Sequence, residues 1–155
     1  MIMKVLRFIR LPLLLLLLFA LARFLLGLRG VPYAPRGNAM FSVVVLTLVS
    51  SFYFGALSKR VGGFGWGGTA LVGLSIGLFA QILVFSLTLI SFLGHLDTSY
   101  YLNPDSLSIP EGTPITMSVI LQTRIGGLVV NAILAVIAAC LGRLLSALAP
   151  RPEGG

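Results

Sequence analysis

A run of eighteen residues without a charge constrains the fold of this chain more than any other feature. It lies between Arg124 and Arg143 and reads IGGLVVNAILAVIAACLG. At about 1.5 Å of rise per helical residue, the two arginines would stand roughly 28 Å apart, close to the roughly 30 Å thickness of a bilayer's hydrocarbon core. They therefore indicate the two interfaces of a membrane-spanning helix. Thr113 followed by Pro114 is typical of a helix start and predicts that this helix begins there.

The composition extends this interpretation to the whole chain. Hydrophobic residues make up 57% of it and charged residues only 10%, whereas about a quarter of a soluble protein is charged. The 155 residues have room for about four spans and no separate soluble domain. We therefore predict an all-α, single-domain integral membrane bundle of four transmembrane helices, arranged up-down-up-down. The expected spans are about residues 11–28, 39–57, 69–93 and 117–146, with a disordered tail at 149–155.

The N-terminal region has two interpretations. Lys4, Arg7 and Arg10 precede a leucine-rich run, and a small-x-small motif at residues 20–22 could be the cleavage site of a secretory signal. Apolar residues resume after Arg23, however, which favours an uncleaved first span in which Arg23 snorkels to the interface. Because this span is rich in leucine and poor in small residues, we expect it to be the most lipid-exposed of the four.

Charge placement predicts the orientation. With the N-terminus inside, seven basic residues lie on the cytoplasmic side, and the remaining four of the eleven lie on the other side. This asymmetry favours cytoplasmic N- and C-termini in the cell (inner) membrane, and an extracytoplasmic loop at residues 94–114. The formal net charge is +7, but the basic residues stand at span ends rather than in a stripe with aromatics. We therefore expect lipid head groups, not nucleic acid, as their partners.

Three polar residues are expected in one layer near the middle of the membrane: Thr47, Gln81 and Asn131. Small residues at helical spacing predict that the third and fourth spans pack closely: Gly73, Gly77, Gly127 and Ala135. Such packing would bring the amides of Gln81 and Asn131 within hydrogen-bonding reach. The layer could then be polar contacts inside the bundle, or it could line the path or site of a ligand or ion.

The loop between the third and fourth spans holds the remaining candidate residues. Its titratable side chains are His95, Asp97, Asp105 and Glu111. One histidine with scattered carboxylates is a weak signal for a metal, so we predict neither a metal nor another cofactor. We expect instead that Arg124 pairs with one of the acids and folds the loop down over the bundle.

The remaining patterns argue against catalysis and coupled transport. Glycines 63, 65 and 68 match GxGxxG, but they join two membrane helices rather than following a strand. Cys140 and His95 belong to opposite membrane faces, and no acid lies inside a predicted span. We therefore predict a non-catalytic accessory or assembly subunit that acts through helix contacts with a protein partner or a second copy. The alternative is a small transporter, channel or lipid-binding protein that uses the mid-membrane polar layer.

Overall fold

The computed structural model describes residues 1–33 and 41–148, and this part of the chain is helical without a strand. The helices are α1 (Ile2–Phe8), α2 (Arg10–Leu28), α3 (Val43–Arg60), α4 (Trp66–Leu93), α5 (Pro104–Leu107) and α6 (Met117–Ser146). By length and composition, α2, α3, α4 and α6 could each cross a membrane. An all-helical chain with four membrane-compatible helices is therefore confirmed. The predicted start of the second span at 39 and the predicted tail at 149–155 lie outside the described residues.

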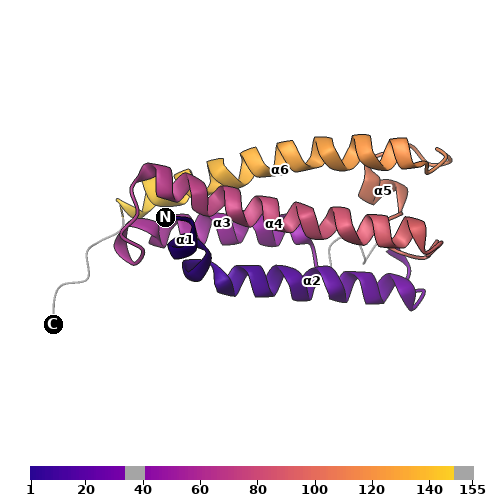
Figure 1. Cartoon of the computed structure of the whole chain (residues 1–155), viewed down its shortest axis with the longest axis horizontal. Helices are drawn as coiled ribbons and strands as arrows, with labels where there is room; N and C mark the ends of the chain where they lie inside the picture. The colour runs from indigo at the N-terminus through magenta and orange to yellow at the C-terminus, as the bar shows by residue number, and fades with distance from the viewer. Residues whose placement is uncertain (34–40, 149–155) are drawn as a thin grey trace.

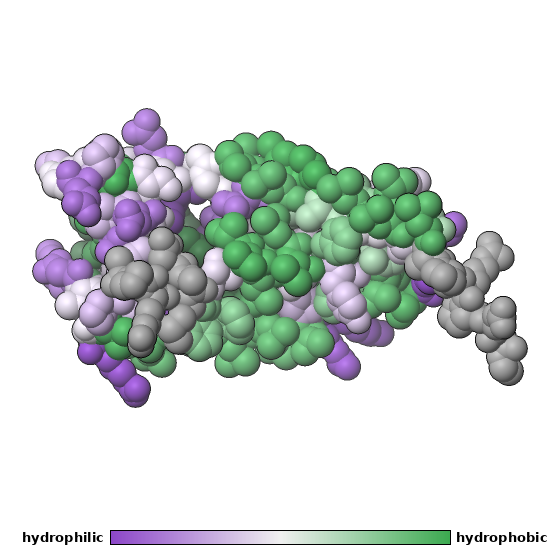
Figure 2. All heavy atoms as spheres, turned by 180° about the vertical axis from the view of Figure 1, so that it is seen from behind, coloured by the Kyte–Doolittle hydropathy of each residue, from purple (hydrophilic) through white to green (hydrophobic). Residues whose placement is uncertain are grey.

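The four long helices lie alongside one another, with α4 between α2 and α6 (Figure 1). Among their most apolar segments, 44% of residues are buried in α4, 28% in α2 and 22% in α6. By this measure α2 and α6 are the two least buried of the four long helices, and the expectation that the first span is the most lipid-exposed stays a prediction. Figure 2 shows hydrophobic residues over the middle of one face and hydrophilic residues gathered at its ends, as expected for a chain surrounded by lipid.

Two helix starts depend on a side-chain cap. The fourth long helix spans Met117–Ser146, as the predicted span 117–146 does, but it starts after Thr116 rather than at the Thr113–Pro114 signal; Thr116 accepts a hydrogen bond from the Val119 amide at 3.4 Å. Helix α3 begins at Val43, after Ser42, whose hydroxyl accepts from the Val45 amide at 3.4 Å. In both cases a hydroxyl satisfies an amide that the first helical turn leaves without a partner.

Two further boundaries lie beyond the predicted spans. Helix α3 continues to Arg60, past the predicted end at residue 57, and the Ser58 hydroxyl is 2.7 Å from the Thr69 hydroxyl of α4. Helix α4 begins at Trp66, one turn earlier than predicted, and the short helix α1 precedes α2. Buried Val5 and Ile9 join the core that α2 and α4 share.

One end of the bundle, the turn end, contains residues 61–65, the end of α3 and the end of α6. Backbones approach closely there: a Cβ on Gly55 would overlap the Ala139 carbonyl, and a Cβ on Gly142 would overlap the Phe52 carbonyl. Only glycine permits such contacts. The turn end is therefore closely packed.

Arg143 of α6 completes the turn end. Its Nη1 donates to the Phe64 carbonyl at 2.9 Å and to the Thr69 hydroxyl at 2.7 Å, and its guanidinium lies 4.5 Å from the centre of the Trp66 ring. Arg60 donates to the Ser146 carbonyl at 2.8 Å. These contacts join the ends of α3 and α6 to the turn between α3 and α4.

Candidate functional site

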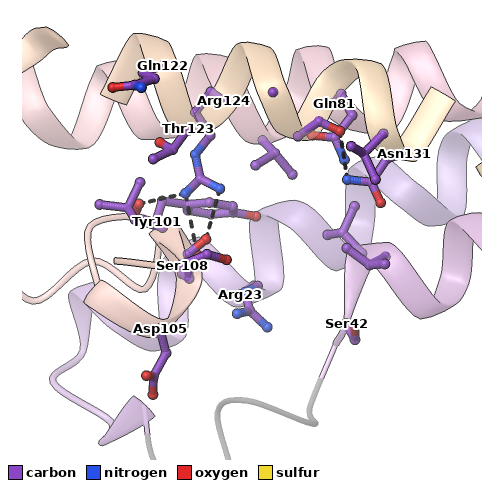
Figure 3. A pocket seen from close by; sticks show the side chains of 18 of the residues that line it. Arg23, Ser42, Gln81, Tyr101, Asp105, Ser108, Gln122, Thr123, Arg124 and Asn131 are labelled. Atoms are coloured by element: carbon purple, nitrogen blue, oxygen red, sulfur yellow. Dashed lines mark hydrogen bonds between the residues drawn. The ribbon is translucent and has the colours of Figure 1, made fainter. Parts of the chain in front are cut away.

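A cavity of about 560 Å³ lies at the opposite end of the bundle, the α5 end, which contains α5 and residues 94–116. It is bordered by α4, α5, α6 and the first residues of α3 (Figure 3). Its polar lining includes Arg23, Gln81, Tyr101, Ser106, Arg124 and Asn131. A cavity of this size is in the range that small-molecule sites occupy.

The lengths of the helices explain where the cavity lies. Helix α3 has 18 residues, whereas α4 has 28 and α6 has 30. The difference of at least ten residues corresponds to about 15 Å of helix. Helix α3 therefore accompanies α4 and α6 over only part of their length, and the cavity lies where α3 begins. Gly126 and Gly127 line it from α6 and contribute no side chain to fill it.

Arg124 holds the loop of the α5 end. Its Nε donates to the Thr88 hydroxyl of α4 at 2.9 Å, Nη1 donates to the Ser106 carbonyl at 3.0 Å, and Nη2 donates to the Tyr101 carbonyl at 2.9 Å. Within residues 1–33 and 41–148, Arg124 makes no bond to a carboxylate. The predicted partner was therefore wrong: main-chain carbonyls of the loop, rather than its acids, accept from the guanidinium.

Three further hydrogen bonds hold the same loop. The Tyr101 phenol donates to the Ala20 carbonyl of α2 at 3.0 Å, the Tyr100 phenol donates to the Pro32 carbonyl at 3.2 Å, and the Ser91 and Ser99 hydroxyls are 2.7 Å apart. Burial raises the pKa of the Tyr101 phenol to about 12, although the positive charges of Arg23 and Arg124 favour its ionised form. Tyr101 therefore remains a neutral hydrogen-bond donor at physiological pH.

Arg23 is a second cation at this cavity, and it is only 8% exposed. Its Nη2 donates to the Tyr33 phenol at 2.9 Å, and its guanidinium lies 5.2 Å from the Tyr33 ring and 5.8 Å from the Tyr100 ring. The sequence suggested a snorkelling side chain at this position. Arg23 instead packs between aromatic rings, where cation–π attraction adds to its hydrogen bond.

The amides of Gln81 and Asn131 line the cavity in the middle of their helices. A Cβ on Gly127 would lie 3.8 Å from Gln81 Oε1 and 3.9 Å from Asn131 Nδ2, so both amides border the same space. Asn131 donates to the Gly127 carbonyl at 2.8 Å rather than to Gln81, with which it was predicted to be within hydrogen-bonding reach. Gln81 is 5% exposed, and its side chain has no hydrogen-bond partner among the described residues.

The other predicted residues lie elsewhere. Thr47 is buried in α3, donates to the Val43 carbonyl at 2.7 Å and does not line the cavity. Gly73 and Gly77 of α4 contact Ala135 of α6, whereas Gly127 faces the cavity. The structure therefore places Gln81 and Asn131 together and Thr47 apart from them.

The titratable residues of the loop do not form a site. His95, Asp97, Asp105 and Glu111 are exposed. Within the described ranges, no three His, Cys, Asp or Glu side chains lie close enough to hold a metal ion. Asp105 borders the cavity, and its carboxylate points away from Arg124 in Figure 3.

Sequence reasoning missed Tyr101 and Ser106 as parts of this site, since a loop carbonyl that accepts from an arginine has no sequence signature. For Arg23, the only signal was its charge inside an apolar span, which we interpreted as snorkelling. Comparisons with protein-family models, curated proteins and solved structures find no match to this chain.

Proposed function

We propose that this chain is a non-catalytic multi-pass membrane protein that binds a small polar or amphipathic ligand in the cavity of the α5 end. The observation that carries the proposal is the side chain of Gln81, which is nearly buried, lines the cavity and has no hydrogen-bond partner among the described residues. Its amide atoms open onto the cavity, whereas the buried side-chain atom without a partner among the described residues is Ser51 Oγ. A bound ligand or water inside the cavity would satisfy the Gln81 amide.

The cavity favours ligand binding over the accessory-subunit role that the sequence predicted. A bundle that acts only through helix contacts needs no partly open cavity of about 560 Å³ between its helices. Within residues 1–33 and 41–148, the acids are Asp97, Asp105 and Glu111, and they lie outside the four long helices. These helices therefore offer no carboxylate for an ion-coupled transport cycle. Binding is therefore the activity that we assign to the cavity.

We propose the orientation that the basic residues predict, with an up-down-up-down path, both termini cytoplasmic and the α5 end outside the inner membrane. The cavity would then extend from the middle of the membrane to its outer leaflet. Attachment of an impermeant reagent to a cysteine at Thr98 in intact cells tests this orientation. Labelling only after the cells are broken would reverse it.

Thiol labelling tests whether the cavity admits water-soluble molecules. The chain has one cysteine, so Cys140→Ala gives a cysteine-free background. Gly127→Cys would place a thiol between Gln81 and Asn131, where a Cβ meets nothing closer than 3.8 Å. We expect a charged, water-soluble methanethiosulfonate to react with it, because only a hydrated thiol ionises and reacts readily.

The matched control is Ile133→Cys, on the same helix at a position that is 54% exposed and outside the cavity. In a membrane this side chain would face lipid, where the thiol stays protonated. We expect Gly127→Cys to react at least ten times faster than Ile133→Cys in lipid nanodiscs. Equal slow rates would show a dry cavity and overturn the proposed function.

A further inference from the structure

We infer that the ligand carries an anionic group, and that this group binds at the arginine end of the cavity while hydrogen-bonding groups of the same ligand reach Gln81. This inference rests on the proposed function and specifies its ligand class. The shared chemistry is a phosphate or a carboxylate, borne either by a lipid head group or by a small soluble molecule.

The first argument is charge. Two arginines, Arg23 and Arg124, line the cavity, and Asp105, with its exposed carboxylate, is the acid among the described lining residues. Hydroxyl and carbonyl groups orient the guanidinium of Arg124 without neutralising it. A cation in a low-dielectric site is costly unless an opposite charge compensates it. An anion in the cavity would supply that charge.

The second argument is the start of α3. Ser42, Val43 and Val44 line the cavity, so the N-terminus of this 18-residue helix borders the same space as the arginines. The aligned peptide dipoles give a helix N-terminus a partial positive charge and amide donors. The helix terminus therefore adds to the positive potential that Arg124 provides.

The third argument is the spacing of the two polar ends. Arg124 and Asn131 are seven residues apart on α6, which corresponds to about 10 Å along the helix. Gln81 Oε1 would lie 3.8 Å from a Cβ on Gly127, which is three residues, or about 5 Å, from Arg124 along the helix. A ligand that satisfies both ends therefore carries its anionic group about 5–10 Å from a hydroxyl, amide or similar group. Figure 3 shows Arg124 and the two amides at separate parts of the cavity.

The walls between these ends favour a lipid as the bearer of the anion. Val44 of α3 and Val130 of α6 line the cavity, yet they are 42% and 55% exposed. The cavity therefore reaches the apolar surface of the bundle, which would face lipid in a membrane. An acyl chain could leave the cavity there while the head group remains inside.

Protection of Gly127→Cys from the thiol reagent tests this inference at the site itself. The protein is placed in nanodiscs of phosphatidylcholine alone or with phosphatidylglycerol of the same acyl chains. The labelling rate of a separate Thr98→Cys variant, at an exposed position, measures how far the membrane charge alone changes the reaction. We expect phosphatidylglycerol to slow labelling at least tenfold. Soluble glycerol phosphate, added to phosphatidylcholine nanodiscs, separates the sources: protection by it alone would assign a soluble anion.

Two variants and two controls complete the test. Arg124→Gln and Gln81→Leu should each remove most of the protection, and Gln81→Leu does so without touching the loop that Arg124 holds. The controls Arg143→Gln and Thr47→Val change a buried arginine and a buried polar residue outside the cavity. In both controls the protection by the anion should remain.

The outcomes distinguish the two proposals. If Gly127→Cys reacts quickly and neither anion slows it, the anion inference is overturned while the proposed function stands. If Gly127→Cys does not react in phosphatidylcholine nanodiscs, both fail.

Discussion

Arg124 and Arg143 stand at opposite ends of α6, and their surroundings differ. Arg143 is 9% exposed, bonds to a carbonyl and a hydroxyl and stacks on Trp66, in a region where glycines bring backbones into contact. Arg124 makes similar bonds but borders a cavity of about 560 Å³. Two arginines of one helix therefore differ in their surroundings: Arg143 lies in closely packed protein, and Arg124 lines a cavity.

The turn end stabilises the bundle, whereas the α5 end holds the cavity to which we assign ligand binding. Interiors are normally packed without voids, and empty polar space is costly. The turn end follows this rule, with its buried arginine bonded to the turn and to α4. The α5 end departs from it at Gln81 and at the start of α3. A departure of this kind is expected where a protein keeps room for a ligand.

Substitution of Gly142 and of Gly127 by alanine should give the largest difference in stability between the two ends. Gly142→Ala would drive its methyl group into the Phe52 carbonyl, whereas Gly127→Ala would place it in the cavity, 3.8 Å from Gln81. We expect Gly142→Ala to lower the free energy of unfolding by about 3 kcal/mol and Gly127→Ala to change it by less than about 0.5 kcal/mol. Thermal unfolding in mild detergent measures both. Equal losses would mean that the α5 end is packed as closely as the turn end.

The two arginines should differ next in how they affect the loop at residues 94–116. Arg124→Gln removes the bonds to Tyr101 and Ser106, each a bond from a charged donor worth about 1.5–3 kcal/mol. We expect protease cleavage of the loop to accelerate tenfold or more, since 1.4 kcal/mol corresponds to roughly a factor of ten. Arg143→Gln should leave this rate unchanged. Equal acceleration by the two variants would indicate general unfolding instead of loss of the loop contact.

Two threonines of α4 accept hydrogen bonds from the two arginines, and their loss should cost different amounts of stability. Thr69 accepts from Arg143 and Thr88 accepts from Arg124, and both are fully buried. Thr69→Val should cost about 1–2 kcal/mol, because no water replaces the lost bond in the packed turn end. Thr88→Val should cost about half as much, because Arg124 can turn its freed Nε–H toward water in the cavity. A larger loss for Thr88→Val, measured by the same unfolding assay, would contradict a hydrated α5 end.

The smallest expected effect concerns Tyr101 and pH. Its pKa is raised from 10.0 to about 12 in the folded protein, so the folded state holds the phenolic proton more tightly than the unfolded chain. The resulting stabilisation is complete below about pH 10 and is lost as the pH rises through about 12. Alkaline absorbance titration should show one of the four tyrosines ionising last, and Tyr101→Phe should remove that step. Unchanged late ionisation in the variant would assign the step to another tyrosine.

The sequence predicted the helices well because lipid leaves a spanning chain few alternatives. Long uncharged runs and the basic residues that bound them gave α2, α4 and α6 to within a few residues. Helix α3 continues three residues past the predicted bound at 57 and includes Lys59 and Arg60. The predicted span 117–146 has the same bounds as α6, although the cap is Thr116 rather than Thr113.

The site was harder to predict than the fold. Polarity in an apolar span identified Gln81 and Asn131, but their relation to Thr47 depends on how α3 is rotated. The role of Arg124 in holding the loop was anticipated, but its acceptors are main-chain carbonyls, which every residue carries. The cavity exists because α3 starts late relative to α4 and α6, and no single residue in the sequence marks that offset.

A crystal structure grown from a lipidic mesophase would show whether the space between Arg124 and Gln81 is occupied. We expect ordered water or a bound anionic molecule there, with the Gln81 amide bonded to it and α6 separated from the start of α3. A closed α5 end, in which Gln81 and Asn131 bond to each other and no space remains between α3 and α6, would contradict this expectation.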